Sequence, residues 1–194
     1  MNSVESKPSL IGIDWGTSSL RAFLIGMDGD VLDSVSTPQG ITYVKDRDFD
    51  AVFHELVGPW LAQMDLPVVA SGMITSRNGW VETPYAQVPA GGSSLAKALV
   101  KFKTSSGQTV HFVTGMTTEH DGAPDVMRGE ETQIAGLLYQ SPDFGGTVCL
   151  PGTHTKWVRV ADRAITSFET CMTGEQFGFF SETSVLSHSM ILGG

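Results

Sequence analysis

Cysteine, positive charge and long apolar runs are all scarce in this sequence of 194 residues. With 12 Lys and Arg against 21 Asp and Glu, the net charge of −9 argues against nucleic acid or an anionic membrane as a partner. No segment approaches the roughly 18 apolar residues of a membrane span, and the polar N-terminus lacks the apolar stretch of a signal peptide. The two cysteines, Cys149 and Cys171, lie in apolar runs without zinc-site spacing, so we expect buried thiols. We therefore expect a soluble, cytoplasmic protein.

A P-loop of the form Gly-x-x-x-x-Gly-Lys-[Ser/Thr] is also absent, which excludes that class of nucleotide site. The hydrophobic share of 41% is enough for a real core, and the apolar patterns indicate an α/β protein. The predicted order, β-β-β-α-β-α-β-α, is the layout of an RNase H-like domain. The expected elements are strands at 10–13, 20–25 and 31–36, a helix at 49–60 capped by Asp48, a strand at 66–71, a helix beginning at Ser94, a strand at 109–114, and a helix from 124 or 128 to 139.

The opening of this pattern recurs near the end of the sequence. Strands are expected at 146–150, 157–161 and 164–171, and Thr173 can cap a following helix. We therefore predict a first RNase H-like subdomain over residues 1–143 and a truncated second copy over 144–194. Because a half-built sheet leaves unpaired edges, we expect the natural protein to continue, or another copy of the chain to supply the missing surface. A homo-oligomer is thus left open.

Two turns combine glycine with hydroxyl side chains, a pattern that suits phosphate binding. Glycine lets backbone N–H groups approach a phosphate, and Asp14, at the strand end before the first turn, can hold Mg²⁺ through water. Two such turns facing each other across a cleft would form a nucleotide clamp. The alternatives are two ordinary hairpins and, for Lys156, a surface lysine. The candidate phosphate-binding residues are Gly16, Thr17 and Ser18 in the first turn, and Gly152, Thr153, His154, Thr155 and Lys156 in the second.

A kinase that acts on an alcohol also needs a carboxylate beside the attacking hydroxyl. Glu130 and Glu131 begin a predicted helix at the edge of the sheet where ligands collect, and Asp125 is a weaker third choice. The residues do not separate the two glutamates. Both would also complement the helix dipole without any catalytic role.

A loop dense in polar and aromatic groups, SGMITSRNGWVETPY at residues 71–85, is a candidate substrate site. An arginine there could pair with a substrate carboxylate, polar groups could bind its hydroxyls, and a tryptophan could form an apolar wall. The alternative is that the aromatic residues anchor the loop to the core. The candidate substrate-binding residues are Arg77, Asn78, Trp80 and Glu82 in this loop and Arg128 near the predicted helix, with Arg77 or Arg128 on the carboxylate.

Several of these stretches together resemble the 2-dehydro-3-deoxygalactonokinase family of the actin–hexokinase superfamily. The resemblance rests on IDWGTSSLRA at 13–22, glycine, tryptophan and Pro-Tyr positions within 72–85, VMRGEETQ at 126–133, PGTHTKWV at 151–158 and TGE at 173–175, all in family order. Thr75 departs from it, standing where the family more often has glycine.

The resemblance implies ATP-dependent, Mg²⁺-assisted phosphorylation of 2-dehydro-3-deoxygalactonate on its terminal hydroxyl, in galactonate breakdown. It also implies that much of the adenosine site lies beyond Gly194, so we expect the 194-residue chain alone to lack a full ATP pocket. Two rival functions are an exopolyphosphatase-like phosphatase, against which the acidic composition argues, and a non-catalytic sugar-binding or assembly module.

Overall fold

The computed structural model describes residues 6–189, and its largest element is a six-stranded sheet in the order β3-β2-β1-β4-β7-β6. Three consecutive antiparallel strands form one half of this sheet, while β4 runs parallel to β1 and β7 parallel to β4. Strand β6 closes the other edge, antiparallel to β7. The strands are β1 (Pro8–Trp15), β2 (Leu20–Gly26), β3 (Val31–Thr37), β4 (Val68–Ser71), β6 (Val100–Lys103) and β7 (Thr109–Phe112).

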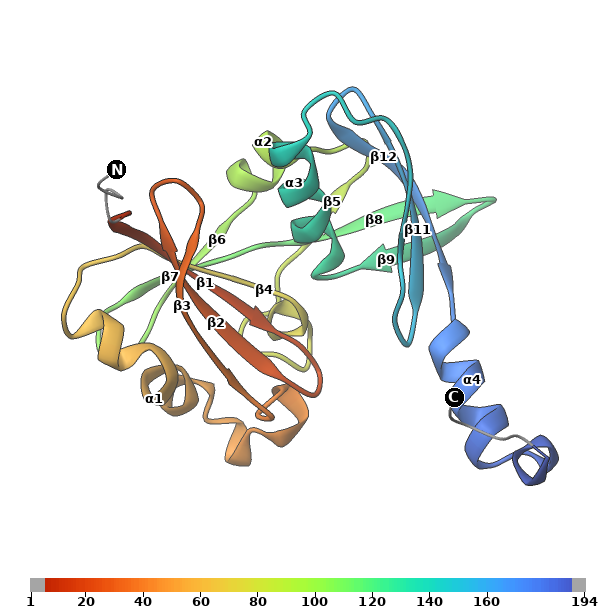
Figure 1. The fold of residues 1–194 in the computed structure, drawn as a ribbon, viewed down its shortest axis with the longest axis horizontal. Coiled ribbons are helices and arrows are strands. Elements are labelled where there is room, and N and C mark those ends of the chain that lie inside the picture. The colour runs from red at the N-terminus through yellow and green to blue at the C-terminus, as the bar shows by residue number, and fades with distance from the viewer. Residues whose placement is uncertain (1–5, 190–194) are drawn as a thin grey trace, which may run out of the picture.

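Helix α1 (Phe49–Leu61) packs against this sheet (Figure 1), and apolar side chains from the helix and the sheet together form the main core. The apolar spacing of the helix places Phe53 and Val57 in that core beside Trp15 of β1, all three fully buried or nearly so. As predicted, Asp48 caps the helix: its Oδ1 accepts a hydrogen bond from the N–H of Ala51 at 3.0 Å.

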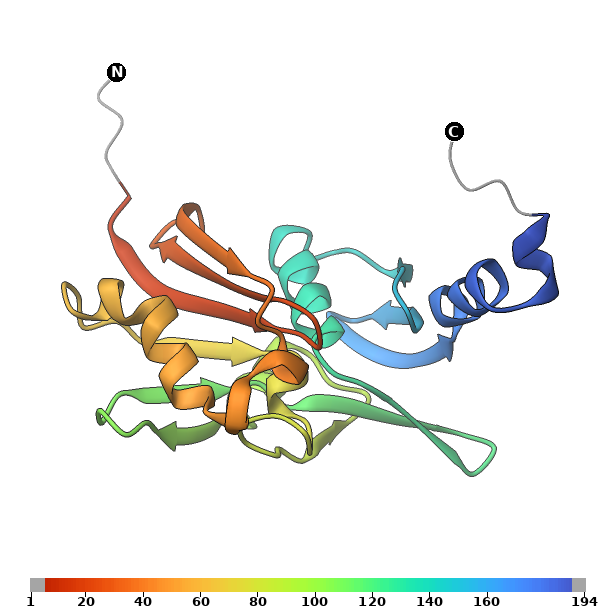
Figure 2. The same ribbon diagram turned by 90° about the horizontal axis from the view of Figure 1, so that it is seen from below.

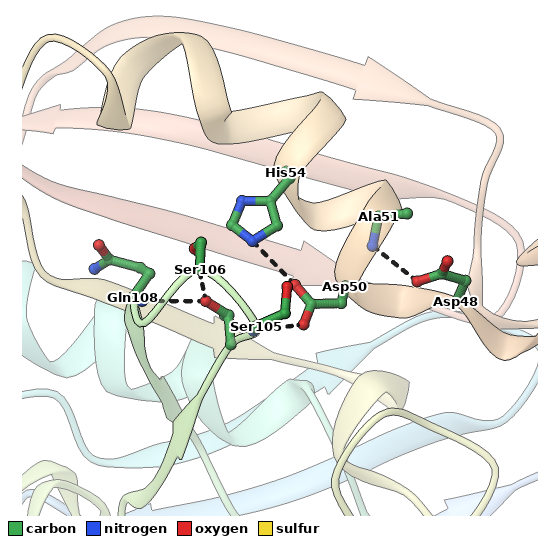
Figure 3. Close-up of polar contacts among 8 residues, drawn as sticks. Asp48, Asp50, Ala51, His54, Ser105, Ser106 and Gln108 are labelled. Carbon is green, nitrogen blue, oxygen red and sulfur yellow. Dashed lines mark hydrogen bonds and ion pairs between the residues drawn. The ribbon is translucent and has the colours of Figure 1, made fainter.

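Polar contacts also tie the start of α1 to the turn between β6 and β7 (Figure 3). Asp50 accepts a hydrogen bond from the backbone N–H of Ser105 at 2.7 Å, and its other oxygen lies 3.0 Å from His54 Nε2. The residues that join helix and turn are thus 55 positions apart in the sequence. They fasten the start of α1 to that turn.

Two smaller three-stranded sheets form the second part of the molecule, in the orders β5-β8-β9 and β10-β11-β12. A bridge between Ala90 and Ile165 joins the segment after β5 to β12, and both residues belong to a second apolar core with α3. In both views α4 extends away from the sheets (Figures 1 and 2). The strands are β5 (Tyr85–Gln87), β8 (Gly115–His120), β9 (Ala123–Met127), β10 (Gly146–Leu150), β11 (Thr155–Ala161) and β12 (Ala164–Cys171). The helices are α2 (Gly92–Lys97), α3 (Glu130–Gln140) and α4 (Thr173–Glu182), with short 3₁₀ turns η1 (Ile41–Tyr43), η2 (Lys45–Arg47), η3 (Met73–Thr75) and η4 (Val185–His188).

The mixed α/β class is confirmed, but one predicted helix is shorter than expected, and of the two predicted starts of another only 128 lies close to the observed start at Glu130. The helix expected from Ser94 spans Gly92–Lys97, because residues 100–103 alternate apolar and charged and form β6 instead. The alternative start at 124 lies in strand β9, which pairs with β8 across the turn Asp121-Gly122. Both residues of this turn have positive φ, as the hairpin turn favoured by Asp-Gly requires, so this dipeptide was the missed signal.

The expectation that both cysteines are buried is wrong, since Cys149 and Cys171 are exposed. Cys149 pairs across the sheet with Trp157, on the face of β11 that is open to solvent. An apolar run in a strand therefore does not by itself imply burial on both faces. No helix in the part of the chain that the structure describes is long and apolar enough to cross a membrane.

Candidate functional site

A cleft of about 300 Å³ lies where the ends of β1 and β10 meet the start of α3. We call it the central cleft. Both glycine-containing turns reach it, although they are 136 positions apart (Gly16 and Gly152), so the tertiary structure brings together the two motifs that the sequence analysis singled out. Its lining residues are Asp14, Gly16, Thr17, Gly72, Met73, Arg128, Gly129, Glu130, Gln133, Leu150, Pro151, Gly152, Thr153 and His154.

The first turn, residues 16–19, connects β1 to β2 and is braced from behind. Gly16 N–H donates to Ser19 O at 2.9 Å, and the hydroxyl of Thr42 donates to Thr17 O at 2.9 Å. A Cβ at Gly40 would lie only 2.2 Å from Thr17 O, so this neighbour must be glycine. Among the described residues, the backbone N–H groups of Thr17 and Ser18 have no hydrogen-bond partner, although Ser18 does not line the cleft. Unpaired, exposed N–H groups in a glycine turn are suited to an anion.

The second turn, residues 151–154, connects β10 to β11 and is braced by the first residues of α4. Glu175 N–H donates to Thr153 O at 3.1 Å, and its carboxylate lies 2.6 Å from His154 Nε2. The hydroxyls of Thr155 and Thr173 lie 2.5 Å apart beneath the turn. Within residues 6–189 the N–H groups of Thr153 and His154 find no acceptor, which parallels the first turn.

The third wall of the central cleft is the N-terminus of α3. Gly129 precedes the helix with a φ of +113°, and a Cβ built on it would lie 3.3 Å from the Cα of Gly72. This close approach joins the loop after β4 to the helix. Glu130 and Gln133, one helical turn apart, both line the cleft, and Glu130 Oε2 accepts a hydrogen bond from Arg128 N–H at 3.0 Å.

Asp14 ends β1 and contributes a half-buried carboxylate to the cleft. Burial raises the pKa of this carboxyl, and the nearby charge of Arg21, whose Nη1 lies 3.4 Å from Oδ2, acts in the opposite direction. The pair is half exposed, so its contribution to stability is small. Its position places a negative charge beside the first turn.

Glu131 differs sharply from its neighbour Glu130, because its side chain is fully buried and does not line the cleft. Its two oxygens accept hydrogen bonds from Gly129 N–H at 3.0 and 2.8 Å. Burial raises the pKa of this carboxyl to about 7, the hydrogen bonds with Gly129 and Thr132 lower it, and the charge of Glu130 adds to the rise. Geometry thus separates the two glutamates that the sequence did not: only Glu130 can reach a ligand in the cleft.

Replacing Glu131 with glutamine is expected to flatten the dependence of stability on pH. With a folded pKa of about 7 against an ordinary value of 4.5, the native state holds a proton that the unfolded state loses. The stabilisation is complete below about pH 4.5 and is lost as the pH rises through 7, and each pH unit in that interval removes about 1.4 kcal/mol. Urea unfolding from pH 4 to 8 should show this slope in the wild type and not in Glu131→Gln. The exposed Glu55→Gln is the control, and parallel curves for wild type and Glu131→Gln would contradict the argument.

Four residues of the predicted substrate loop lie outside the central cleft. Arg77, Asn78 and Glu82 are exposed or partly exposed and do not line it. Trp80 packs its ring 5.1 Å from Phe102 in the main core, so it anchors the loop, which was the alternative left open. Of the candidate arginines, only Arg128 lines the cleft.

Two predicted phosphate-binding side chains are used inside the protein instead. The hydroxyl of Thr155 serves the brace beneath the second turn. Lys156 is buried on β11, and its Nζ donates to Val126 O and to Thr170 Oγ1, each at 2.6 Å. Asp125, the third candidate base, accepts two hydrogen bonds from Thr170. Lys156 and Asp125 thus join β9 to β11 and β12. Neither they nor Thr155 line the central cleft.

Six residues line the cleft but were not among the predicted site residues, namely Gly72, Met73, Gly129, Gln133, Leu150 and Pro151. Gln133 could have been found, because it lies three positions after Glu130 and therefore on the same helix face. Gly72 has a φ of +96°, and a Cβ there would lie 2.8 Å from Trp15 O. That approach depends on how β1 and β4 pair, which no local pattern reveals.

The residues present fit a magnesium ion held mainly by phosphate and water. Residues 6–189 contain no group of three or more His, Cys, Asp or Glu side chains that could hold a metal by themselves. The carboxylates in the cleft are Asp14 and Glu130. Mg²⁺ commonly uses one or two carboxylates, keeps several waters and takes its remaining ligands from substrate phosphates.

Comparison with known proteins points to one family. The family model described as 2-keto-3-deoxy-galactonokinase matches residues 14–193. A 2-dehydro-3-deoxygalactonokinase of Escherichia coli is 38% identical over 181 residues, and a Rhizobium meliloti protein named as a probable 2-dehydro-3-deoxygalactonokinase is 35% identical over 178. These alignments cover 93% and 92% of this chain and 58% of each relative. A crystal structure from Sinorhizobium meliloti, whose description names the same activity, superposes with a TM-score of 0.84 at 35% identity, over 92% of this chain and 59% of that one.

Proposed function

The chain belongs to the 2-keto-3-deoxy-galactonokinase family, and from this premise we propose that it serves the ATP-dependent phosphorylation of 2-dehydro-3-deoxy-D-galactonate on its terminal hydroxyl. The reaction would be a step of galactonate breakdown in the cytoplasm. One observation carries the proposal: two turns with unpaired N–H groups, a carboxylate at a helix start and an arginine line the same cleft.

The two turns would hold the phosphates of ATP. Thr17 from one side, and Thr153 and His154 from the other, line the cleft and offer backbone N–H groups without a partner in the described residues. Ser18 adds a further unpaired N–H group to the first turn, outside the lining of the cleft. Phosphoryl transfer depends on positioning and on neutralising charge, so such a clamp supplies much of the catalysis. Mg²⁺, when bound, would neutralise phosphate charge, and Asp14 would hold it through water. Lys156 has no part in this proposal, because its ammonium group is engaged inside the protein.

Arg128 and Glu130 would act on the sugar acid. Arg128 would bind its carboxylate, and Glu130 would accept the proton of the terminal hydroxyl as its oxygen bonds to the γ-phosphorus and the bond to ADP breaks. Both residues line the central cleft, and Glu130 does so from the first turn of α3. Glu131 instead stabilises the helix start by accepting the N–H of Gly129.

The strand order supports an RNase H-like fold for the six-stranded sheet, which would be the centre of a subdomain proposed to span residues 1–143. Three antiparallel strands followed by parallel β4 and β7 give the order 3-2-1-4-7 at its centre. The antiparallel strands β10 to β12, followed by α4, support the opening of a second copy from residue 144. In the proposed arrangement each copy contributes one phosphate turn to the cleft.

An assay of ADP release tests the proposed function. The 194-residue chain would be incubated with ATP, Mg²⁺ and a panel of sugar acids, with the full-length Rhizobium meliloti relative alongside and with calorimetry of acid binding. Release of ADP that depends on 2-dehydro-3-deoxy-D-galactonate supports the proposal. Phosphate release from ATP or polyphosphate without any acid would indicate a phosphatase, and binding of the acid without transfer would indicate a sugar-binding module.

A further inference from the structure

Arg128 contacts Thr75, Thr83 and Tyr85, none of which has a role in the proposed reaction. We infer that these three are positioning residues, which hold the guanidinium so that one of its edges stays available to a planar carboxylate. This inference rests on the proposed function, because it concerns how the same cleft selects an acid. None of the three residues lines the central cleft, whereas Arg128 does.

The hydrogen bonds of Arg128 occupy a defined part of the guanidinium. Nη1 donates to the hydroxyls of Thr75 at 2.6 Å and of Thr83 at 2.7 Å. Nη2 donates to the carbonyl oxygen of Thr83 at 3.2 Å. The hydroxyl and carbonyl oxygens of Thr83 thus accept one hydrogen bond each from Nη1 and Nη2, at the end of the guanidinium. The hydroxyl of Thr75 accepts the second hydrogen bond from Nη1.

Two of the five guanidinium donors remain, one on Nη2 and one on Nε. They lie on the same edge, which is the side-on edge that arginine uses to bind carboxylates with two parallel hydrogen bonds. Nε is buried and has no hydrogen-bond partner among the described residues. A buried donor without a partner is costly, and an acceptor that a ligand brings to this edge would remove that cost.

The surroundings keep this edge in place. Thr75 and Thr83 are 0% and 3% exposed, so their hydroxyls cannot turn to water. Thr75 also donates to Gly72 O at 3.0 Å, which directs its lone pairs at Arg128. The ring of Tyr85 stacks against the guanidinium, with its centroid 4.3 Å from Cζ. An arginine held in this way loses little side-chain entropy when it binds a carboxylate.

Binding of the acid and of its uncharged methyl ester tests the inference. Isothermal titration with 2-dehydro-3-deoxy-D-galactonate and with the ester should show that the wild type prefers the acid. Thr75→Val keeps the shape and removes the hydroxyl, so we expect Kd for the acid to rise about tenfold while Kd for the ester stays nearly constant. Thr75→Ser, which keeps the hydroxyl, should keep the preference of the wild type for the acid over the ester. Tyr85→Leu should weaken acid binding, whereas Tyr85→Phe, which keeps the ring, should not.

The outcomes distinguish this inference from the proposed function. If Thr75→Val and Tyr85→Leu keep the wild-type preference for the acid, or weaken acid and ester equally, the three residues are structural and the inference fails alone. If the wild type binds neither compound, the proposed substrate is wrong and the inference falls with it. Thermal unfolding of each variant confirms that it is folded before the titrations are compared.

Discussion

Replacing Glu130 with glutamine is expected to lower kcat by about 10²-fold or more while substrate binding stays nearly intact. Glutamine has the same shape and keeps an oxygen that can accept the N–H of Arg128, now bonded at 3.0 Å. It cannot take the proton of the attacking hydroxyl. Because the lost interaction belongs to the transition state, kcat should fall and KM for the acid should change little in steady-state kinetics.

Glu131→Gln is the matched control for this prediction, since it makes the same change one residue further along α3. Its side chain is buried beneath the helix start, so kcat should stay within a few-fold of the wild type. A slow Glu131→Gln beside a normal Glu130→Gln would reverse the assignment. If both are normal, the glutamates are structural and the base lies elsewhere.

Replacing Asp14 with asparagine is expected to lower turnover by about 10²-fold and to raise the Mg²⁺ concentration needed for half-maximal activity. Asparagine keeps the size of the side chain at the end of β1 but removes the charge that would orient the water shell of the ion. Titration of activity with MgCl₂ at saturating ATP measures both effects. Binding of the sugar acid should be unaffected, because Asp14 has no proposed role there.

Asp28→Asn provides the control, because Asp28 is exposed in the turn between β2 and β3, away from the central cleft. It removes the same charge from the protein without touching the site. Equal losses in Asp14→Asn and Asp28→Asn would mean that overall charge matters and not the position of Asp14. An unchanged Mg²⁺ requirement in a slow Asp14→Asn would contradict the metal role.

Local patterns were enough for much of the fold and for both turns. Short apolar runs located β1 to β3, and Gly146, Leu150 and Cys171 were correctly predicted to be strand ends. Asp48 was identified as a cap from its residue type alone. Glycine followed by hydroxyl residues after a strand also indicated both turns, because their chemistry is contained in a few consecutive residues.

Other predictions failed where the same local pattern allows two environments. The segment from Val100 to Lys103 was predicted to continue a helix, but in the structure it is strand β6 and pairs with β7. Lys156 has a charge suited to binding phosphate, yet its ammonium group donates hydrogen bonds to the carbonyl oxygen of Val126 and the hydroxyl of Thr170. Trp80 sits in a polar loop, yet its ring completes the main core. In each case the deciding contact comes from a residue distant in the sequence.

The sequence by itself determined the family, the order of most elements and the two turns that carry glycine and hydroxyl groups, because short-range periodicity and composition encode these. Only the tertiary structure decided which residues share the cleft. In that structure Glu131 is buried and Glu130 lines the cleft. Of the two candidate arginines, Arg128 lines the cleft and Arg77 does not. The reason is physical: burial, pKa and hydrogen-bond partners are set by segments that meet through β-sheet pairing and core packing, and residue spacing along the chain does not contain that information.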